Sequence, residues 1–201
     1  MSTSALAEWG ELLRARLAGL VALSEEQIAV LYAHYELLLR WNRVLNLTAI
    51  RNRGEAIDRH YYESLFLAAH LPRGPLRIAD VGSGGGFPGF PVAVFRPDCR
   101  VVLIESHQRK AVFLKEAGRQ LRNLQVLALR AEQVQDAFDH VISRAVSYRD
   151  LGDMLRKLAP NADLLTGAER PPDGFGFVWE EAIALPLGKH RFLRVGHRCF
   201  T

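Results

Sequence analysis

Apolar residues in the first third of the chain recur with the period of an α-helix. Leucine and tryptophan repeat at helical spacing over residues 5–20, and isoleucine, leucine and tyrosine do so again after Ser24. Ser24 and Gln27 have the S-x-x-Q pattern of a capping box, which marks the start of the second helix. The pattern predicts helices over residues 5–20, 24–42 and 55–71, so that residues 1–74 form an N-terminal helical cap.

From residue 76 onward, short apolar runs alternate with helical segments. Strands are expected over residues 76–81, 100–105, 124–129, 138–143 and 162–165, with helices over 90–95, 108–121 and 150–158. Such alternation implies an α/β fold with a doubly wound, mostly parallel sheet covered on both faces. Segments 177–185 and 190–195 are expected to close the sheet as an antiparallel hairpin. Residues 75–201 are therefore predicted to form the α/β core.

A glycine-rich loop follows the first predicted strand and precedes a helix. Such a loop has little side-chain bulk, so a ligand can lie directly on its backbone. Strand, glycine loop and helix start together are typical of a nucleotide-type cofactor site. The loop carries five glycines, with an acid before them and two prolines among them: Asp80, Gly82, Gly84, Gly85, Gly86, Pro88, Gly89 and Pro91.

Two cofactor classes fit this loop. Gly84, Gly86 and Gly89 match the dinucleotide fingerprint G-x-G-x-x-G. An acid followed by two spaced glycines, here Asp80, Gly82 and Gly84, is the pattern of S-adenosylmethionine (SAM) enzymes. The two prolines remove N–H groups that a pyrophosphate would need, which favours SAM. An NAD-type oxidoreductase and a glycine turn without a ligand remain the alternatives.

Polar residues at the ends of the next three strands complete the candidate cofactor site. Glu105 ends the second strand, where a carboxylate can accept both hydroxyls of a ribose in either cofactor class. Ala131 and Glu132 follow the third strand, where a small residue and a carboxylate suit an adenine. Arg144 follows the fourth and could hold a methionine carboxylate or a substrate phosphate. Each position also has an alternative interpretation without a ligand. Glu105 would be an ordinary acid at a helix start, Ala131 and Glu132 would form a surface turn, and Arg144 would be a solvated arginine at a strand end.

Composition excludes some classes of protein. No apolar run approaches the roughly 20 residues of a membrane span, and we expect neither a membrane association nor a signal peptide. Cys99 and Cys199 lack metal-ligand spacing, so we expect reduced thiols in a cytoplasmic protein and no metal site. The net charge of +4 permits a nucleic-acid partner without requiring one. Nothing in the sequence suggests an obligate protein partner.

The motifs that are missing narrow the methyl acceptor. The chain has no Asn-Pro-Pro-Tyr-like clamp of amino-methylating enzymes and no cysteine placed to attack a pyrimidine. Guanine N7 carries a free lone pair and needs no base, so positioning can supply most of its catalysis. Tyr61, Tyr62 and Phe87 could stack on a base. Phosphate contacts are expected from basic residues, with candidates at Arg40, Arg43, Arg51, Arg53, Arg59, His60, Arg109, Lys110, Arg130 and Arg144.

Several motifs in order resemble one bacterial family. WNRVLNLTAI (41–50), RHYYESL (59–65), DVGSGGGFPGFPVA (80–93), IESHQRKAVFL (104–114), RAE (130–132) and ISRA (142–145) are similar to the small-subunit ribosomal RNA guanine-N7 methyltransferases, the RsmG family, also called glucose-inhibited division protein B. The resemblance covers roughly residues 25–160. It implies a class I SAM-dependent methyltransferase with a Rossmann-like core, acting on a guanine in the decoding-region loop of 16S rRNA.

The resemblance also implies residue roles. SAM contacts fall on Gly82, Phe87, Glu105, Ala131, Glu132 and Arg144, and the catalytic pocket uses Asn46, His60 and Arg130 as well as Arg144. The substrate would be 16S rRNA, a 30S subunit or an assembly intermediate. Thr166-Gly167 departs from the family's Lys-Gly pair, which weakens the inference for substrate contacts nearby. A SAM-sensing or RNA-binding module without turnover is therefore the second functional hypothesis.

Overall fold

The computed structural model describes residues 3–144, 154–171 and 176–198. Two long helices open the chain, α1 over Thr3–Leu17 and α2 over Glu25–Trp41. The predicted capping box is confirmed, because the Ser24 hydroxyl accepts the Gln27 N–H at 3.2 Å and the Gln27 side chain accepts the Ser24 N–H at 2.9 Å. The cap satisfies two backbone donors that would otherwise have no partner within the helix.

The third predicted helix is a helix of changing pitch. It consists of α3 over Arg53–Ala56, a π-helix over Ile57–Tyr62 and α4 over Glu63–His70. Two carbonyls of the π-helix accept side-chain donors, those of Arg59 and His60 from Arg144 and Ser64 respectively. One of these donors lies far away in the sequence, so the local pattern could not have predicted the change of pitch. π-Helical turns often lie at functional sites.

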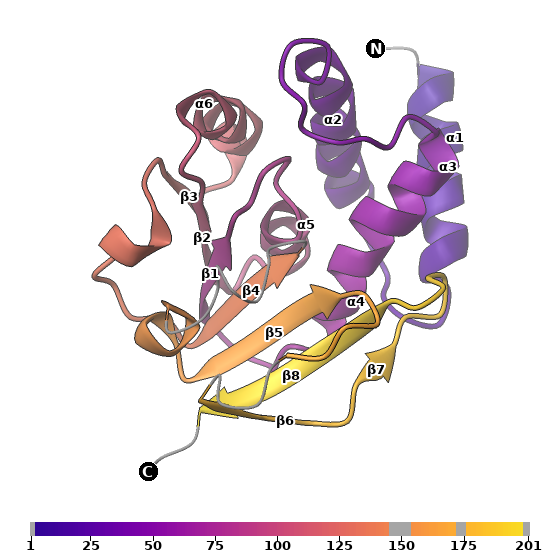
Figure 1. Ribbon diagram of the computed structural model, residues 1–201. Coiled ribbons are helices and arrows are strands. Elements are labelled where there is room, and N and C mark those ends of the chain that lie inside the picture. Colours follow the sequence, from indigo (N-terminus) through magenta and orange to yellow (C-terminus); the bar gives the residue numbers. More distant parts are fainter. Residues whose placement is uncertain (1–2, 145–153, 172–175, 199–201) are drawn as a thin grey trace.

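The sheet has the strand order β3-β2-β1-β4-β5-β8-β6 (Figure 1). Strands β1 to β5 pair in parallel, whereas β8 runs antiparallel to β5. The predicted α/β, Rossmann-like fold is confirmed. The strands span Arg77–Val81 (β1), Arg100–Ile104 (β2), Leu124–Leu127 (β3), His140–Arg144 (β4), Asn161–Thr166 (β5), Phe177–Trp179 (β6), Ile183–Ala184 (β7) and Phe192–Arg198 (β8).

The predicted closing hairpin is antiparallel, but its first arm is not one strand. β6 and β7 pair separately with β8, through Val178 opposite His197 and Ile183 opposite Leu193. Residues 180–182 between them are not in a strand. β8 inserts between β5 and β6, so the last described strand of the chain is not at the edge of the sheet.

Shorter helices complete the core. α5 spans Gly89–Phe95, and α6 spans Gln108–Ala117 before a 3-10 turn over Gly118–Gln120. α6 is shorter than predicted because the chain turns at Gly118 and passes close to β3, where an added Cβ would lie 2.5 Å from Leu124 Cδ2. Residues 154–158 are helical, and the predicted beginning of that helix lies outside the described residues.

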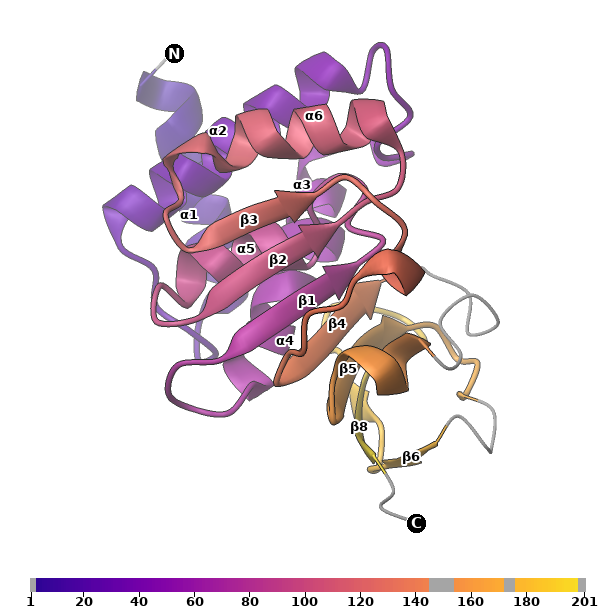
Figure 2. The same ribbon diagram turned by 90° about the vertical axis from the view of Figure 1, so that its left-hand side faces the viewer.

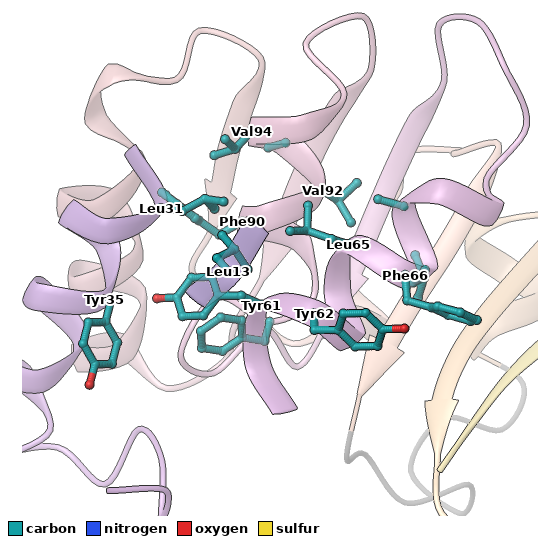
Figure 3. Packing of buried hydrophobic residues seen from close by; sticks show 14 of the residues in the cluster. Leu13, Leu31, Tyr35, Tyr61, Tyr62, Leu65, Phe66, Phe90, Val92 and Val94 are labelled. Carbon is teal, nitrogen blue, oxygen red and sulfur yellow. The ribbon is translucent and has the colours of Figure 1, made fainter. Parts of the chain in front are cut away.

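The two faces of the sheet carry two apolar clusters. One cluster joins α1, α2, α4, α5 and α6 to the sheet, and Figure 3 shows Leu13, Leu31, Tyr61, Leu65 and Phe90 gathered there. The other lies beneath the helix at 154–158 and the 3-10 turn after β3 (Ala131–Gln133), on the side that faces the viewer in Figure 2. The N-terminal helices therefore share one core with the sheet. Among the described helices, none is long and apolar enough to cross a membrane.

Candidate functional site

The site lies where the strand order of the parallel sheet reverses, between β1 and β4. In open α/β sheets, ligands bind in the crevice beyond the carboxyl ends of the strands at this point. Val81 at the end of β1 is level with Ile104 of β2 and Ser143 of β4. This register brings the residues that follow, Gly82, Glu105 and Arg144, to the same edge of the sheet.

The glycine loop has a backbone conformation that favours glycine. Gly82, Gly84 and Gly86 have φ angles of 73°, 53° and 90°, in the left-handed region that other residues rarely adopt. The Gly82 N–H donates to the Ile104 carbonyl at 3.0 Å, which ties the loop to β2. The loop therefore presents backbone with little side-chain bulk at the edge of the sheet.

Asp80 connects β1 to the start of α5. It is fully buried, and its Oδ2 accepts the Gly89 N–H at 2.9 Å. Burial raises the pKa of Asp80 to about 7, against the lowering effect of that N–H. Its other carboxyl oxygen, Oδ1, is buried without a hydrogen-bond partner. A buried acceptor of this kind is suited to a ligand donor or a water.

Glu105 closes the glycine loop against the start of α6. Its Oε2 accepts the Gly84 N–H at 2.9 Å and its Oε1 accepts the His107 N–H at 2.8 Å. Each carboxylate oxygen has a second lone pair, so the group can still accept ribose hydroxyls. The structure therefore adds a role in shaping the loop to the predicted role in binding a ribose.

A second group of predicted residues meets around Phe87. The His60 ring stacks on Phe87 with centroids 4.4 Å apart and planes at 14°, and the Arg144 guanidinium lies 5.3 Å from the same ring centroid. Arg144 Nη2 donates to His60 Nδ1 at 2.8 Å. Guanidinium has no acceptor, so Nδ1 must be unprotonated and Nε2 carries the hydrogen. Nε2 then donates to Thr48 Oγ1 at 2.8 Å.

These contacts fix the charge state of the cluster. Burial, followed by the charge of Arg144, lowers the pKa of His60 to about 2, so the imidazole is neutral. Burial lowers the pKa of Arg144 to about 10, although Glu63 raises it, and the guanidinium stays charged at pH 7. Arg144 Nη1 also donates to the Arg59 carbonyl of the π-helix. Arg144 is thus a nearly buried cation held in one orientation.

His34 of α2 connects the helical cap to the glycine loop. Its Nε2 lies 3.0 Å from the Gly85 carbonyl and its Nδ1 lies 2.9 Å from the Tyr61 hydroxyl. A carbonyl can only accept, so Nε2 carries the hydrogen and Nδ1 accepts from Tyr61. The ring stacks on Phe90 at 4.1 Å, and burial lowers the pKa of His34 to about 3. The sequence pattern offered no signal for this contact beyond an apolar helix face.

Other predicted site residues lie apart from these contacts. Asn46, Arg130 and Glu132 are exposed, and Ala131 is buried in the 3-10 turn after β3. In the described part of the chain, none of the three exposed side chains makes a hydrogen bond or an ion pair with Arg144 or His60. Their predicted roles stay predictions.

A different asparagine organises the loop that carries Asn46. Asn42 Oδ1 accepts the N–H groups of Leu47 and Thr48 at 2.8 and 3.0 Å, and Asn42 Nδ2 donates to the Thr48 carbonyl at 2.9 Å. Sequence reasoning missed Asn42 and Thr48 as functional candidates, although both lie in the quoted motif WNRVLNLTAI.

Four of the predicted phosphate-binding arginines are exposed and have no side-chain partner among the described residues. Arg43 lies in the loop of residues 42–50, Arg40 and Arg51 lie close to its two ends in the sequence, and Arg109 lies on α6. In the regions that the structure describes, their side chains make no ion pair or hydrogen bond. The same regions hold no group of three side chains suited to a metal ion.

Comparisons with known proteins identify relatives by sequence. A family model described as GidB, rRNA small subunit methyltransferase G, matches residues 27–165. The chain is 43% identical over 129 residues to a ribosomal RNA small subunit methyltransferase G of Chromobacterium violaceum, covering 62% of the chain and 61% of that protein. It is 44% identical over 140 residues to the protein of that name from Nitrosospira multiformis, covering 68% and 63%. The chain spans less than two thirds of the length of these relatives.

Solved structures resemble the fold. Magnesium protoporphyrin IX methyltransferase of Synechocystis PCC 6803, solved with bound SAH, has a TM-score of 0.60 at 14% identity, over 86% of this chain and 98% of that one. A fibrillarin pre-rRNA processing protein of Methanococcus jannaschii has a TM-score of 0.53 at 15% identity, over 63% and 67%. At such identities the likeness concerns the fold alone.

Proposed function

The chain belongs to the GidB family of rRNA small subunit methyltransferases G, and on this premise we propose that it transfers a methyl group from SAM to N7 of a guanine in 16S ribosomal RNA. One observation carries the proposal: the glycine loop contacts Glu105, through the Gly84 N–H, at the sheet edge where the strand order reverses. The proposed substrate is 16S rRNA, either free or within a 30S particle. We therefore propose that the protein acts in the cytoplasm.

The residues present fit SAM. An added Cβ at the left-handed Gly84 would have no atom nearer than 3.8 Å, so a ligand has room on the loop backbone there, and Asp80 Oδ1 is a buried acceptor without a partner. Glu105 would accept the ribose hydroxyls, and Arg144 would hold an anionic group at the boundary between cofactor and RNA. Ala131 and Glu132 would contact the adenine. SAM supplies a methyl group on a positively charged sulfur.

The chain's own residues would position the acceptor rather than remove a proton. His60 is neutral and both of its ring nitrogens are engaged, so it is unsuited to act as a base. Guanine N7 has a free lone pair and needs no base, which matches this site. Arg144 would orient donor and acceptor together, an effect that can supply much of the rate of a displacement.

Ribosomal RNA would lie over the exposed basic residues. Phosphate contacts supply most of the affinity and position the RNA, while base contacts specify the target. Arg40, Arg43, Arg51 and Arg109 are exposed and have free guanidinium groups, and they are the proposed phosphate ligands. The exposed Asn46 and Arg130 are proposed to act at the target base or beside it.

The proposal is tested by binding and by product mapping. Calorimetry with SAM, S-adenosylhomocysteine (SAH) and NAD should show binding of SAM and SAH but not of NAD. The protein should also transfer labelled methyl groups to 16S rRNA that was isolated from a strain lacking it. Mapping should place the methyl group on N7 of one guanine. EDTA should not reduce the rate when the magnesium-dependent fold of the RNA is controlled for.

Other results would contradict the proposal. Tight NAD binding without a SAM signal would indicate an oxidoreductase. SAM binding without transfer to any ribosomal RNA would indicate the sensing or RNA-binding module, a possibility that rests on the departure at Thr166-Gly167.

A further inference from the structure

One buried carboxylate near the site is shared by three arginines. Glu63, at the start of α4, has a side chain that is 1% exposed. Arg191 donates to it from two positions, Nε to Oε1 at 3.1 Å and Nη2 to Oε2 at 2.8 Å. Arg59 Nε lies 3.0 Å from Oε1, and Arg144 Nη1 lies 3.9 Å from Oε2.

From this arrangement we infer that Glu63 and Arg191 are positioning residues, which hold Arg144 in the orientation used for methyl transfer. The inference rests on the proposed function, because it assumes that Arg144 orients the reactants. Arg191 lies in the turn before β8, outside the segment that matches the family model, and the resemblance assigns no role to either residue.

The charges explain why both residues are needed. Three guanidinium groups near one another repel, and a buried carboxylate offsets part of that repulsion. Without the Glu63 charge, Arg144 would be driven toward solvent by Arg59 and Arg191. Without the Arg191 charge, Oε2 of Glu63 would lose its donor. Arg144 could then turn toward this oxygen and away from His60.

The position of Arg144 in turn determines its partners in the site. Its guanidinium is 5.3 Å from the Phe87 ring centroid and donates to His60 Nδ1. A movement of about 1 Å can cost roughly a hundredfold in rate where geometry supplies the catalysis. The ion pair thus couples the turn before β8 to the contacts of Arg144, although Arg191 is 47 positions away from Arg144 in the numbering.

The test uses Glu63→Gln and Arg191→Gln in the full chain, with Arg191→Lys as the conservative variant. Asp58→Asn is the matched control, because Asp58 lies on the π-helix that immediately precedes Glu63 and pairs with Arg16 at 2.8 Å instead. Circular dichroism and thermal unfolding show which variants fold. The readouts are the ring ¹⁵N signals of His60 at neutral pH without SAM, and the methyl-transfer rate at saturating SAM and RNA.

We expect the His60 Nδ1 signal to shift in both glutamine variants, because the nitrogen loses its charged donor. The saturated rate should fall by about tenfold to a hundredfold, Arg191→Lys should recover part of it, and Asp58→Asn should change neither readout. If Glu63→Gln does not fold, the His60 signals and the saturated rate of Arg191→Gln decide whether the inference holds.

Folded variants with unchanged His60 signals would overturn the inference, and so would shifted signals with an unchanged saturated rate. A wild-type chain that binds no SAM would overturn the proposed function, a separate result because the His60 signals are read without cofactor.

Discussion

At the scale of single residues, His60 acts as a neutral bridge between Arg144 and Thr48. Its pKa of about 2 lies far below the range of activity assays, so its protonation should not control the rate. We predict that the methyl-transfer rate at saturating substrates shows no inflection attributable to His60 between pH 5.5 and 8 (a window set by the ordinary histidine pKa of about 6.5). An inflection near pH 6.5 that disappears in His60→Gln would instead identify a base.

Glu105 provides a second prediction at this scale. Both of its oxygens accept backbone N–H groups, and an amide can accept at one position only. Glu105→Gln should therefore turn an NH₂ toward a backbone donor and loosen the loop at Gly84. SAM affinity should fall by about 1–3 kcal/mol, the usual cost of a lost charged hydrogen bond.

Calorimetry measures this loss of affinity, and excess SAM should restore much of the rate. Amide exchange at Gly84 should become faster in the same variant. Unchanged exchange with weakened SAM binding would mean that Glu105 serves the ribose alone.

At the scale of elements, the junction of β1 and α5 depends on the absence of a side chain at Gly89. An added Cβ would lie 2.4 Å from Leu103 Cδ2 and 2.6 Å from Asp80 Oδ2. Alanine in place of glycine usually stabilises a helix by about 1 kcal/mol. Here overpacking should prevail, and Gly89→Ala should destabilise the protein by about 1–3 kcal/mol.

Urea unfolding measures this effect. Gly167→Ala is the control, because a Cβ there would meet nothing within 4 Å. If both variants have the same stability, the close contact between α5 and the sheet must relax without cost.

The loop between α2 and α3 depends on Asn42 rather than Asn46. Asn42→Ala removes three hydrogen bonds that shape the backbone at Leu47 and Thr48, and should cost about 2 kcal/mol of stability. Asn46 is exposed, so Asn46→Ala should change stability by less than about 0.5 kcal/mol. Its effect should instead appear in the rate of RNA methylation. Equal losses of stability in the two variants would contradict this division of roles.

At the scale of the whole molecule, His34 makes stability depend on pH. Its pKa is about 3 in the folded protein and near 6.5 when unfolded, so the unfolded chain binds the extra proton in between. The stabilising effect is complete above pH 6.5 and is lost as the pH falls toward 3. The contribution of His34 alone should fall by about 1.4 kcal/mol for each pH unit within that window.

His34→Gln removes this group while keeping a possible donor to the Gly85 carbonyl. The variant should be less stable than wild type at pH 7, and the difference should shrink as the pH falls from 6.5 to 4.5 (within the window between the two pKa values). Urea unfolding at several pH values measures it. A constant difference would mean that His34 titrates normally in the folded protein.

The predictions from sequence succeeded where a local pattern carried the information. Ser24 and Gln27 marked a helix start because capping involves neighbours in the chain. Asp80, Gly82, Gly84 and Glu105 were brought together because parallel strands align their carboxyl ends at one edge. The π-helix and the Glu63–Arg191 pair could not be predicted, because their partners are separated by up to 128 positions.

Local patterns along the chain were enough to predict the α/β class, the glycine loop and the family resemblance, since periodicity and turn residues act over short distances. The contacts between side chains became known only from the folded structure. It assigned one tautomer to His60 and one to His34, gave Glu105 two backbone donors, and left Asn46 exposed while Asn42 shapes the loop. These outcomes depend on burial and on hydrogen-bond partners from other elements, which exist only once the chain has folded.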